Sequence, residues 1–402
     1  MVGIELEQAV EILLSQAHAP QDTEEVHILE ACGRTLAEDI LATFDNPPFD
    51  RSPLDGYALR SVDTVKASAE APVRLRIVGE ECAGDFFAGE IGPGEALRIM
   101  TGGAMPKGTD AVIRQEDVTV SESFLAVPYE LRHHENYCFT GEDIKKGTLL
   151  LKCGEVLNAP RIGVLASQGR ATVKVYRRPR IVLGGTGDEL LQPGEPLSPG
   201  KIYNSNLYLI APRLQELGAD TKILGIIPDD PQAAATKLRQ ELDWGDLLLT
   251  TGGVSVGKKD IMHEVIKLLP SQRLFWGVNL KPGYPMLAYK LDKALGIALS
   301  GNPFAAYTTF ELLARPVIDK LCGRQSQSFT RTTAVLKDAF PKESRGRRFL
   351  RAHYDAATGT VALPSQHSSG SLFSAVNCNA LIDLPPGTGK LAPGTQVSLL
   401  LL

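Results

Sequence analysis

The sequence lacks the features that mark membrane proteins and disulfide-linked secreted proteins. No stretch approaches the roughly 20 consecutive apolar residues that a membrane-spanning helix requires. The six cysteines are scattered and form no C-x-x-C pair, so we expect neither disulfide bonds nor a zinc site. The opening MVGIELEQAVEILL predicts an amphipathic helix with three glutamates, whereas a signal peptide needs a basic flank and an uninterrupted apolar run. We therefore expect a cytoplasmic protein without a membrane partner.

The charge balance gives no sign of a nucleic-acid partner. Lys and Arg number 42 against 47 Asp and Glu, which gives a net charge of −5. Binding to nucleic acid or to an anionic membrane surface usually shows an excess of basic residues. The chain has 402 residues, 43% of them hydrophobic, which is long for a single core. We expect about two to four domains.

The rhythm of the sequence changes several times along the chain. Residues 1–45 look helical and lead to FDNPPFDRSPLDGYA, whose adjacent prolines forbid regular structure and predict a domain edge near residue 46. Short β runs separated by GPG, PKG and GED turns cover 72–145 and predict a small β domain. Beyond about Gly323 a β pattern returns, typical of a small barrel or sandwich.

Between these β regions, from Arg180 on, strands alternate with helices. The runs RIVLGG, KILGII, DLLLT and LGIALS predict buried strands, and one helix is expected from about Asn204 to Gly218. Further helices are expected in PDDPQAAATKLRQEL and from Pro303. This alternation predicts a doubly wound α/β domain with a largely parallel sheet.

Four polar loops follow the predicted strands. They are GGTGDEL (184–190), PDD (228–230), TTGGVSVGKKD (250–260) and SGNPF (300–304). Ligands of an open α/β sheet bind outside the carboxyl ends of its strands, where these loops would meet. The loops offer glycines and hydroxyls to a phosphate. They also offer carboxylates to a hard cation such as Mg²⁺, from Asp188, Glu189, Asp229, Asp230 and Asp260.

The third loop is close to a P-loop without completing the motif. From Gly252 the letters fit G-x-x-x-x-G-K, but Lys259 stands where a P-loop needs Ser or Thr for Mg²⁺. A degenerate P-loop, a plain turn and a phosphate cradle of another kind are the alternatives. A plain turn does not explain four polar loops at one edge. In a cradle, backbone amides around Gly252–Ser255 bind the phosphate, and the side chain of Lys258 matters little.

Seven motifs along the chain resemble one known family. SPLDGYA, RIMTGGAMPKGTDAVI, GEDI, TGDEL, LTTGGVSVGKKD, LKPG and SGNPF, in this order, are similar to the molybdopterin molybdenumtransferases, the family of MoeA and the gephyrin E domain. The resemblance spans nearly the whole chain and implies four parts and a homodimer. The parts are an elongated N-terminal α/β segment (1–45 and 146–178), a small β domain (46–145), a molybdopterin-binding-type α/β domain (179–325) and a C-terminal β-barrel-like domain (326–402).

The resemblance also implies a reaction. The family converts adenylylated molybdopterin and molybdate, with Mg²⁺, into molybdenum cofactor and AMP. Mg²⁺ is then the cofactor and molybdate a substrate, while the adenylyltransferase and the apo-enzymes that receive the cofactor are implied protein partners. Two alternatives stay open. One is a paralogue that binds pterin or cofactor as a carrier or scaffold, and the other is an enzyme that loads tungstate.

Carried over by motif, three acids are the expected metal ligands: Glu189, Asp229 and Asp230. Glu189 could instead cap a helix start, and Asp230 could cap the helix that begins at Pro231. The residues expected to contact the nucleotide or pterin are Thr101, Gly102, Gly252, Gly253, Ser255, Ser300, Gly301, Asn302 and Pro303.

Four further residues match catalytic positions of the family: Asp55, Asp143, Asp260 and Lys281. Each also has a structural alternative. Asp260 could cap the helix that starts in IMHEVIKLL, and Lys281 could be a surface lysine. Asp55 and Asp143 could be turn residues, although the resemblance implies that they face the partner subunit's pocket. In the C-terminal part, Arg351 and Ser369 resemble oxyanion-binding positions.

The sequence departs from the family pattern at four places. Gly277 stands where a basic residue is frequent, and Tyr284 replaces the second lysine of KPGKP. NYC, ending at Cys138, replaces NIR, and Ser300 replaces the proline of PGNP. Each change removes positive charge or rigidity near an anion site, which indicates a divergent member.

Overall fold

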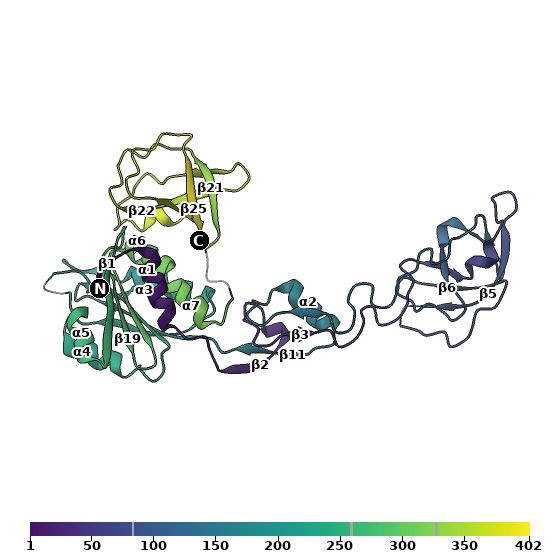
Figure 1. Ribbon diagram of the computed structural model, residues 1–402, viewed down its shortest axis with the longest axis horizontal. Coiled ribbons are helices and arrows are strands. Elements are labelled where there is room, and N and C mark those ends of the chain that lie inside the picture. Colours follow the sequence, from purple (N-terminus) through teal and green to yellow (C-terminus); the bar gives the residue numbers. More distant parts are fainter. Residues whose placement is uncertain (83, 258–259, 326–328) are drawn as a thin grey trace. The chain divides into compact units, whose positions relative to one another are not determined.

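The computed structural model describes residues 1–82, 84–257, 260–325 and 329–402, which form two compact units (Figure 1). Unit 1 comprises Met1–Ala37, Gly154–Asn158 and Val173–Leu402, and unit 2 comprises Glu38–Cys153 and Ala159–Thr172. The prediction about the Lys258 side chain concerns a position outside the described residues. The four domain boundaries expected from the sequence stay a prediction.

Unit 1 contains a seven-stranded sheet with the order β1-β17-β19-β20-β16-β12-β15. All neighbouring pairs are parallel except those of β19, which runs antiparallel to β17 and β20. Only a short turn joins β19 to β20, and such a turn allows only an antiparallel pair. The largely parallel sheet is thus confirmed. Its strands are β1 (Val2–Ile4), β12 (Arg180–Thr186), β15 (Asp220–Ile227), β16 (Leu247–Thr251), β17 (Ser271–Val278), β19 (Leu287–Leu291) and β20 (Leu295–Leu299).

Helices cover both faces of this sheet (Figure 1). In β12, Ile181 and Leu183 belong to one apolar core while Val182 belongs to the other. Strands buried on both faces read as continuous apolar runs, which is why RIVLGG and DLLLT are recognisable in the sequence. The first core includes α1 (Leu6–Gln16), α3 (Ser205–Glu216), α6 (Pro303–Thr309), η4 (Phe310–Ala314) and α7 (Arg315–Leu321), and the second includes α4 (Pro231–Arg239) and α5 (Met262–Leu268). No helix in the described part of the chain is long and apolar enough to cross a membrane.

The expectation that residues 1–45 are helical holds only for α1, because Val2–Ile4 is the strand β1 and the chain beyond Gln16 forms other elements. α1 is followed by β2 (Thr23–His27), η1 (Ile28–Glu30) and β3 (Ile40–Leu41). β2 pairs with β11 (Thr172–Tyr176), and β3 pairs with β10 (Leu149–Leu151). Because both partners lie more than a hundred residues further along the chain, local periodicity could not indicate these strands.

Unit 2 contains the predicted β domain as a six-stranded sheet with the order β7-β4-β6-β5-β9-β8. β4 lies between β7 and β6 and is antiparallel to both. The helix α2 (Ala159–Ser167) also belongs to this unit. The remaining elements of unit 2 are β3, β10, β4 (Gly56–Leu59), η2 (Ser61–Thr64), β5 (Val73–Glu81), β6 (Glu95–Ile99), β7 (Ala111–Arg114), η3 (Gln115–Asp117), β8 (Thr119–Ser121) and β9 (Phe124–Val127).

The C-terminal strands of unit 1 form a closed barrel, drawn in light green to yellow in Figure 1. Its order is β22-β23-β21-β25-β24, and β24 pairs back onto β22. Of the two expected forms, a barrel or a sandwich, the barrel is the one present. β18 (Leu280–Lys281), which precedes β19, adds to its edge by pairing with β22. The barrel elements are β21 (Arg331–Leu336), β22 (Arg347–Asp355), β23 (Thr360–Ala362), η5 (Phe373–Ala375), β24 (Ala380–Leu384) and β25 (Gln396–Leu401).

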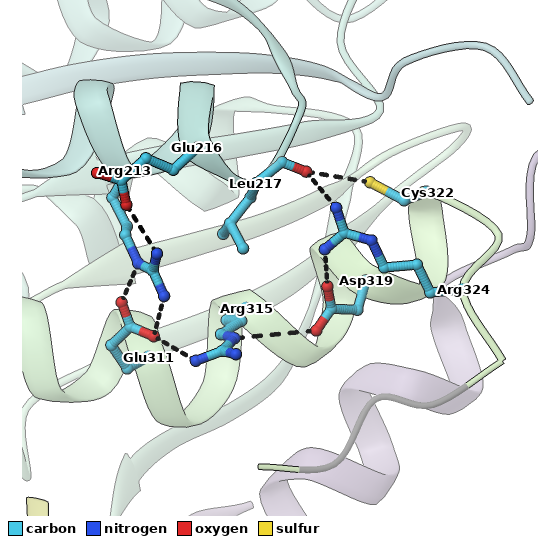
Figure 2. A network of polar contacts seen from close by, with 8 residues as sticks. All are labelled: Arg213, Glu216, Leu217, Glu311, Arg315, Asp319, Cys322 and Arg324. Atoms are coloured by element: carbon cyan, nitrogen blue, oxygen red, sulfur yellow. Dashed lines mark hydrogen bonds and ion pairs between the residues drawn. The ribbon is translucent and has the colours of Figure 1, made fainter. Parts of the chain in front are cut away.

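A buried network of charged side chains fastens the helical segment α6–η4–α7 to α3 (Figure 2). Glu311 lies on the π-helical turn η4 and its side chain is 0% exposed. Its carboxylate accepts hydrogen bonds from Arg213 of α3 at 2.6 Å and from Arg315 at 3.2 Å. A buried carboxylate needs such partners, because an unpaired charge in the interior costs several kcal/mol. The network therefore fixes the helix that begins at the SGNPF loop.

Candidate functional site

Loops at the carboxyl ends of four strands surround a cavity of about 740 Å³, here called the loop pocket. These strands are β12, β15, β16 and β20, so the four polar loops meet at one edge of the sheet as the topology requires. The predicted site residues that line the loop pocket are Glu189, Asp229, Gly252, Gly253, Ser255, Asp260, Ser300, Gly301, Asn302 and Pro303.

Two acidic loops of the loop pocket are tied to each other. The backbone N–H of Asp188 donates to Oδ2 of Asp229 at 3.2 Å, and that of Asp229 donates to Oδ1 of Asp188 at 3.1 Å. The carboxylate of Glu189 lies against Gly187, where a Cβ would come within 2.7 Å of both carboxylate oxygens. The φ of Gly187 is +147°, a conformation that favours glycine, and Glu189 and Asp229 present oxygens to one cavity.

Asp230 caps the start of α4, which was the structural alternative to its predicted role as a metal ligand. Its Oδ1 accepts the N–H of Ala233 at 2.6 Å at the start of α4, and it is not among the residues that line the loop pocket. Among the described residues, no three His, Cys, Asp or Glu side chains are grouped to hold a metal ion. Two carboxylates from neighbouring loops still suit Mg²⁺, which keeps several waters and takes phosphate oxygens as ligands.

The side chain of Asp260 accepts hydrogen bonds from the backbone of the glycine loop to which it belongs. Its Oδ1 accepts the N–H of Ser255 at 2.8 Å and its Oδ2 accepts the N–H of Gly257 at 2.6 Å. α5 begins at Met262 with Ile261 at its N-cap position and no capping side chain. The alternative that Asp260 caps this helix is therefore wrong.

The backbone amides of the glycine loop are partly occupied. Gly252 N–H donates to the carbonyl of Leu299 at 3.0 Å, and Ser255 N–H is bound by Asp260. Within the described chain this leaves the N–H groups of Gly253 and Val254 as the donors that a phosphate could meet. The N–H groups of Gly252 and Ser255 are therefore not free to bind a phosphate as expected, although Ser255 still lines the loop pocket.

Both glycines of this loop have left-handed backbone conformations. The φ of Gly252 is +89° and a Cβ there would lie 2.6 Å from the carbonyl oxygen of Thr186. The φ of Gly253 is +66° and its Cβ would lie 2.9 Å from Oγ1 of Thr186. Glycine is required here because side chains strain this conformation and because the loop packs directly on the end of β12.

A second cavity, of about 970 Å³, lies between the α/β domain and the barrel and is here called the junction pocket. It shares Ser300 and Asn302 with the loop pocket, so the two cavities adjoin. The structure brings Lys281, Arg351 and Ser369 together in its lining. Lys281 is exposed, as a surface lysine would be, yet it lines this cavity.

Arg351 is a buried cation with unused donors. It is 1% exposed, and its guanidinium lies 4.0 Å from the centre of the Phe304 ring. Nη2 donates to the carbonyls of Gln366 and Ser368, whereas Nε and Nη1 have no partner in the described part of the chain. Burial lowers the pKa of the guanidinium. Unpaired N–H groups on a buried charge are costly, and an oxyanion in the junction pocket would satisfy them.

The remaining predicted residues lie in unit 2. Asp55, which precedes β4, accepts hydrogen bonds from the N–H of Thr101 at 2.7 Å and from its hydroxyl at 2.6 Å. These bonds hold the pKa of Asp55 below its usual range. Gly102 follows with a φ of +84°. Asp143 is exposed and accepts a hydrogen bond from the side chain of Asn46 at 3.1 Å.

Sequence reasoning missed two residues that hold the site loops. Asn206 donates from Nδ2 to the carbonyl of Gly301 at 2.8 Å. Trp276 donates from Nε1 to the carbonyl of Val254 at 2.9 Å and so anchors the glycine loop. The NSN stretch at the start of α3 could have indicated Asn206. Nothing local marks Trp276, because its contact crosses from one strand to the loop of another.

Gly277 and Tyr284, two of the positions that depart from the family pattern, lie against each other. A Cβ at Gly277, whose φ is +78°, would lie 2.9 Å from Cζ of the Tyr284 ring. That ring in turn lies edge-to-face on Trp276 with centroids 5.7 Å apart. The positive φ of Gly277 therefore disfavours a side chain at this position, and the Tyr284 ring occupies the space beside it.

Comparisons with known proteins agree along the whole chain. Residues 4–169 match the MoeA N-terminal region (domain I and II), residues 185–320 match the probable molybdopterin binding domain, and residues 333–402 match the MoeA C-terminal region (domain IV). A molybdopterin molybdenumtransferase of Bacillus subtilis is 37% identical over 95% of this chain and 90% of the relative. One of Staphylococcus epidermidis is 34% identical over 99% and 95%. The crystal structure of the molybdopterin biosynthesis MoeA protein of Pyrococcus horikoshii has a TM-score of 0.86 at 30% identity, with both chains fully covered.

Proposed function

The chain belongs to the molybdopterin molybdenumtransferase family, and we propose that it inserts molybdate into adenylylated molybdopterin with Mg²⁺-dependent release of AMP. Its place in molybdenum cofactor biosynthesis and its character as a transferase follow from that membership. The proposal concerns the adenylylated substrate, Mg²⁺ and AMP.

One observation supports this chemistry above others: two carboxylates and two unoccupied backbone amides share one cavity. Glu189 and Asp229 bring carboxylates to the cavity that would receive a polyanionic ligand, and a cation bound beside them would offset the repulsion. They would hold Mg²⁺, which when bound neutralises charge on the phosphoanhydride. The N–H groups of Gly253 and Val254 would bind a phosphate oxygen. Asp260 keeps these amides in place by closing the loop.

The adjoining junction pocket supplies the place for the oxyanion. Molybdate is a tetrahedral dianion, and Lys281 and Arg351 offer it N–H donors with full positive charge. Ser369 lines the same wall and can donate from its hydroxyl. Because the two cavities adjoin at Ser300 and Asn302, both substrates would be bound side by side.

The carrier or scaffold alternative is less well supported by this arrangement. A protein that only binds anionic pterin has no need of two carboxylates in its pocket, since without a cation they oppose binding. Tungstate is not distinguished from molybdate by these contacts, because the two oxyanions share charge and shape. The assay with each oxyanion therefore decides between molybdate and tungstate.

The decisive assay is incubation with adenylylated molybdopterin, Mg²⁺ and either oxyanion, following AMP release and pterin metallation. We expect both products with molybdate. Glu189→Gln should lower AMP release by about 100-fold or more, since losing a charged ligand costs several kcal/mol. Glu264→Gln is the control, because this exposed α5 acid pairs with Lys267 and does not line the loop pocket. Unchanged turnover of Glu189→Gln at limiting Mg²⁺ would contradict the metal assignment, and binding without AMP release would favour the carrier.

The assembly and location of the enzyme are part of the proposal. We propose a homodimer in which Asp55, Thr101 and Asp143 serve the loop pocket of the partner subunit, as the family resemblance implies. The reaction would take place in the cytoplasm. The adenylyltransferase would deliver the substrate, and cofactor-dependent apo-enzymes would receive the product.

A further inference from the structure

A third cavity, of about 930 Å³, lies beside the junction pocket and is here called the basic pocket. It forms where 279–284 of the α/β domain meet 342–348 and 386–390 of the barrel. Six of its thirteen lining residues are Lys or Arg and two are Glu. Because the whole chain is acidic, with a net charge of −5, this concentration of positive charge is a local feature.

The strand pairing of β18 with β22 builds the centre of the basic pocket. Leu280 is opposite Arg347, and Lys281 is opposite Arg348. Arg347 is neutralised by Asp383, with bonds of 2.9 and 2.8 Å, and by Glu7. Lys281 and Arg348 have no acidic partner in the described chain. Like charges directly opposite each other destabilise a strand pair, so this pair is suited to an anion.

The other cations of the basic pocket are also unpaired. Within the described residues the side chains of Lys342, Arg345 and Lys390 make no ion pair or hydrogen bond. Nε of Arg348 is buried without a partner. These unpaired cations outnumber the two glutamates of the lining, so the pocket offers charged donors to an anion.

We propose that the basic pocket is a second anion site, distinct from the position at Arg351, which takes a phosphate-rich small molecule carrying a diphosphate or polyphosphate group. The cations come from three separate segments, so one tetrahedral ion would meet only some of them. Linked phosphates meet several at once. The site itself does not depend on the proposed function, and only its effect on oxyanion loading rests on that function.

Three of these cations also line the neighbouring cavity. Lys281, Lys342 and Arg348 line both the basic pocket and the junction pocket. An anion bound in the basic pocket therefore draws on charges that an oxyanion at Arg351 would use. Binding in the two cavities should be mutually weakening, so a polyphosphate ligand would act as an inhibitor of oxyanion loading.

Titration calorimetry of the full chain with inorganic pyrophosphate at constant ionic strength tests the site. The double variant Arg345→Gln/Lys390→Gln changes residues that line the basic pocket and not the junction pocket. We expect it to weaken pyrophosphate binding roughly tenfold or more. Arg351→Gln should leave the affinity within about twofold. The matched control Lys267→Gln/Lys337→Gln removes two exposed charges elsewhere in unit 1.

Three outcomes would overturn the proposal. They are no pyrophosphate binding by the unaltered protein, equal weakening in the control variant, and loss only in Arg351→Gln, which would place the ion in the junction pocket. Thermal unfolding of each variant verifies that it is folded. Because the probe contains neither pterin nor molybdate, failure of the transferase assay would leave this result unaffected, and the reverse also holds.

Discussion

Asp383 shows how a single charge ties strands of the barrel together, because its carboxylate binds Arg347 of β22 and Arg331 of β21. Burial raises the pKa of its carboxyl, but hydrogen bonds and charge interactions with Arg347 and then Arg331 outweigh burial and leave the pKa lowered. A carboxyl whose pKa is lower in the folded state stabilises the fold above its unfolded pKa, about 3.9. That contribution disappears as the pH falls through the lower, folded value.

We predict that Asp383→Asn lowers the free energy of unfolding by about 3 kcal/mol at pH 7, because it leaves Arg347 and Arg331 without their buried partner. Below pH of about 4 the difference should shrink, because the carboxyl takes up a proton first in the unfolded state and then, at its lower pKa, in the folded state. Urea unfolding of both proteins at pH 7 and across the acid range measures this. A constant difference over that range would show that packing, rather than charge, accounts for the effect.

Among the elements, β17 affects the site through Trp276. Its indole N–H holds the carbonyl of Val254, and its ring contacts His263 of α5 and Tyr284, with centroids 5.6 and 5.7 Å away. Gly253 and Val254 are the two residues of the Gly252–Ser255 segment whose N–H groups have no hydrogen-bond partner in the described chain. The strand therefore sets the orientation of the donors that a phosphate would meet.

We predict that Trp276→Phe weakens the binding of AMP, used as a mimic of the nucleotide part, about five- to tenfold while the protein stays folded. The change keeps most of the ring packing but removes one hydrogen bond of roughly 1 kcal/mol. Calorimetric titration measures the loss. The matched control is Trp244→Phe, because Trp244 packs in the second core and lies near Arg180, away from the loop pocket. Equal losses in both variants would refute a positioning role for Trp276.

The same element scale shows what the sequence could predict of the fold. The strands of the α/β sheet and helices such as Ser205–Glu216 follow from local apolar patterns and from the capping residue Asn204. The strands Thr23–His27 and Ile40–Leu41 could not be predicted, because each exists only through a partner far away in the sequence. Short exposed strands show little of the apolar and polar alternation that would identify them in a sequence.

Prediction of the site had a similar limit. Parallel strands bring their carboxyl ends to one edge, so the meeting of Glu189, Asp229 and Gly252 could be expected from topology. The bonds from Asp260 to the loop amides depend on the exact course of the loop, which residue spacing does not give. The same is true of the basic pocket, because it arises where the barrel joins β18.

At the scale of the whole molecule, the predicted catalytic residues are divided between the two units. Asp55 and Asp143 belong to unit 2, whereas Glu189, Asp229 and Lys281 belong to unit 1. If the proposed homodimer completes each loop pocket with unit 2 of the partner subunit, a defect in one unit can be compensated by a second chain. A site built within one chain does not allow such compensation.

We predict that mixing Asp55→Ala chains with Glu189→Ala chains restores about a quarter of the wild-type sites when subunits exchange at random. Half of the dimers then contain one chain of each kind. Each such dimer has one site with both acids intact and one site with neither. AMP release after mild denaturation and refolding of the mixture measures the recovery, and mass analysis of differently tagged chains verifies exchange. If activity after verified exchange stays at the level of the separate variants, both acids act within one chain and the shared-site homodimer is wrong.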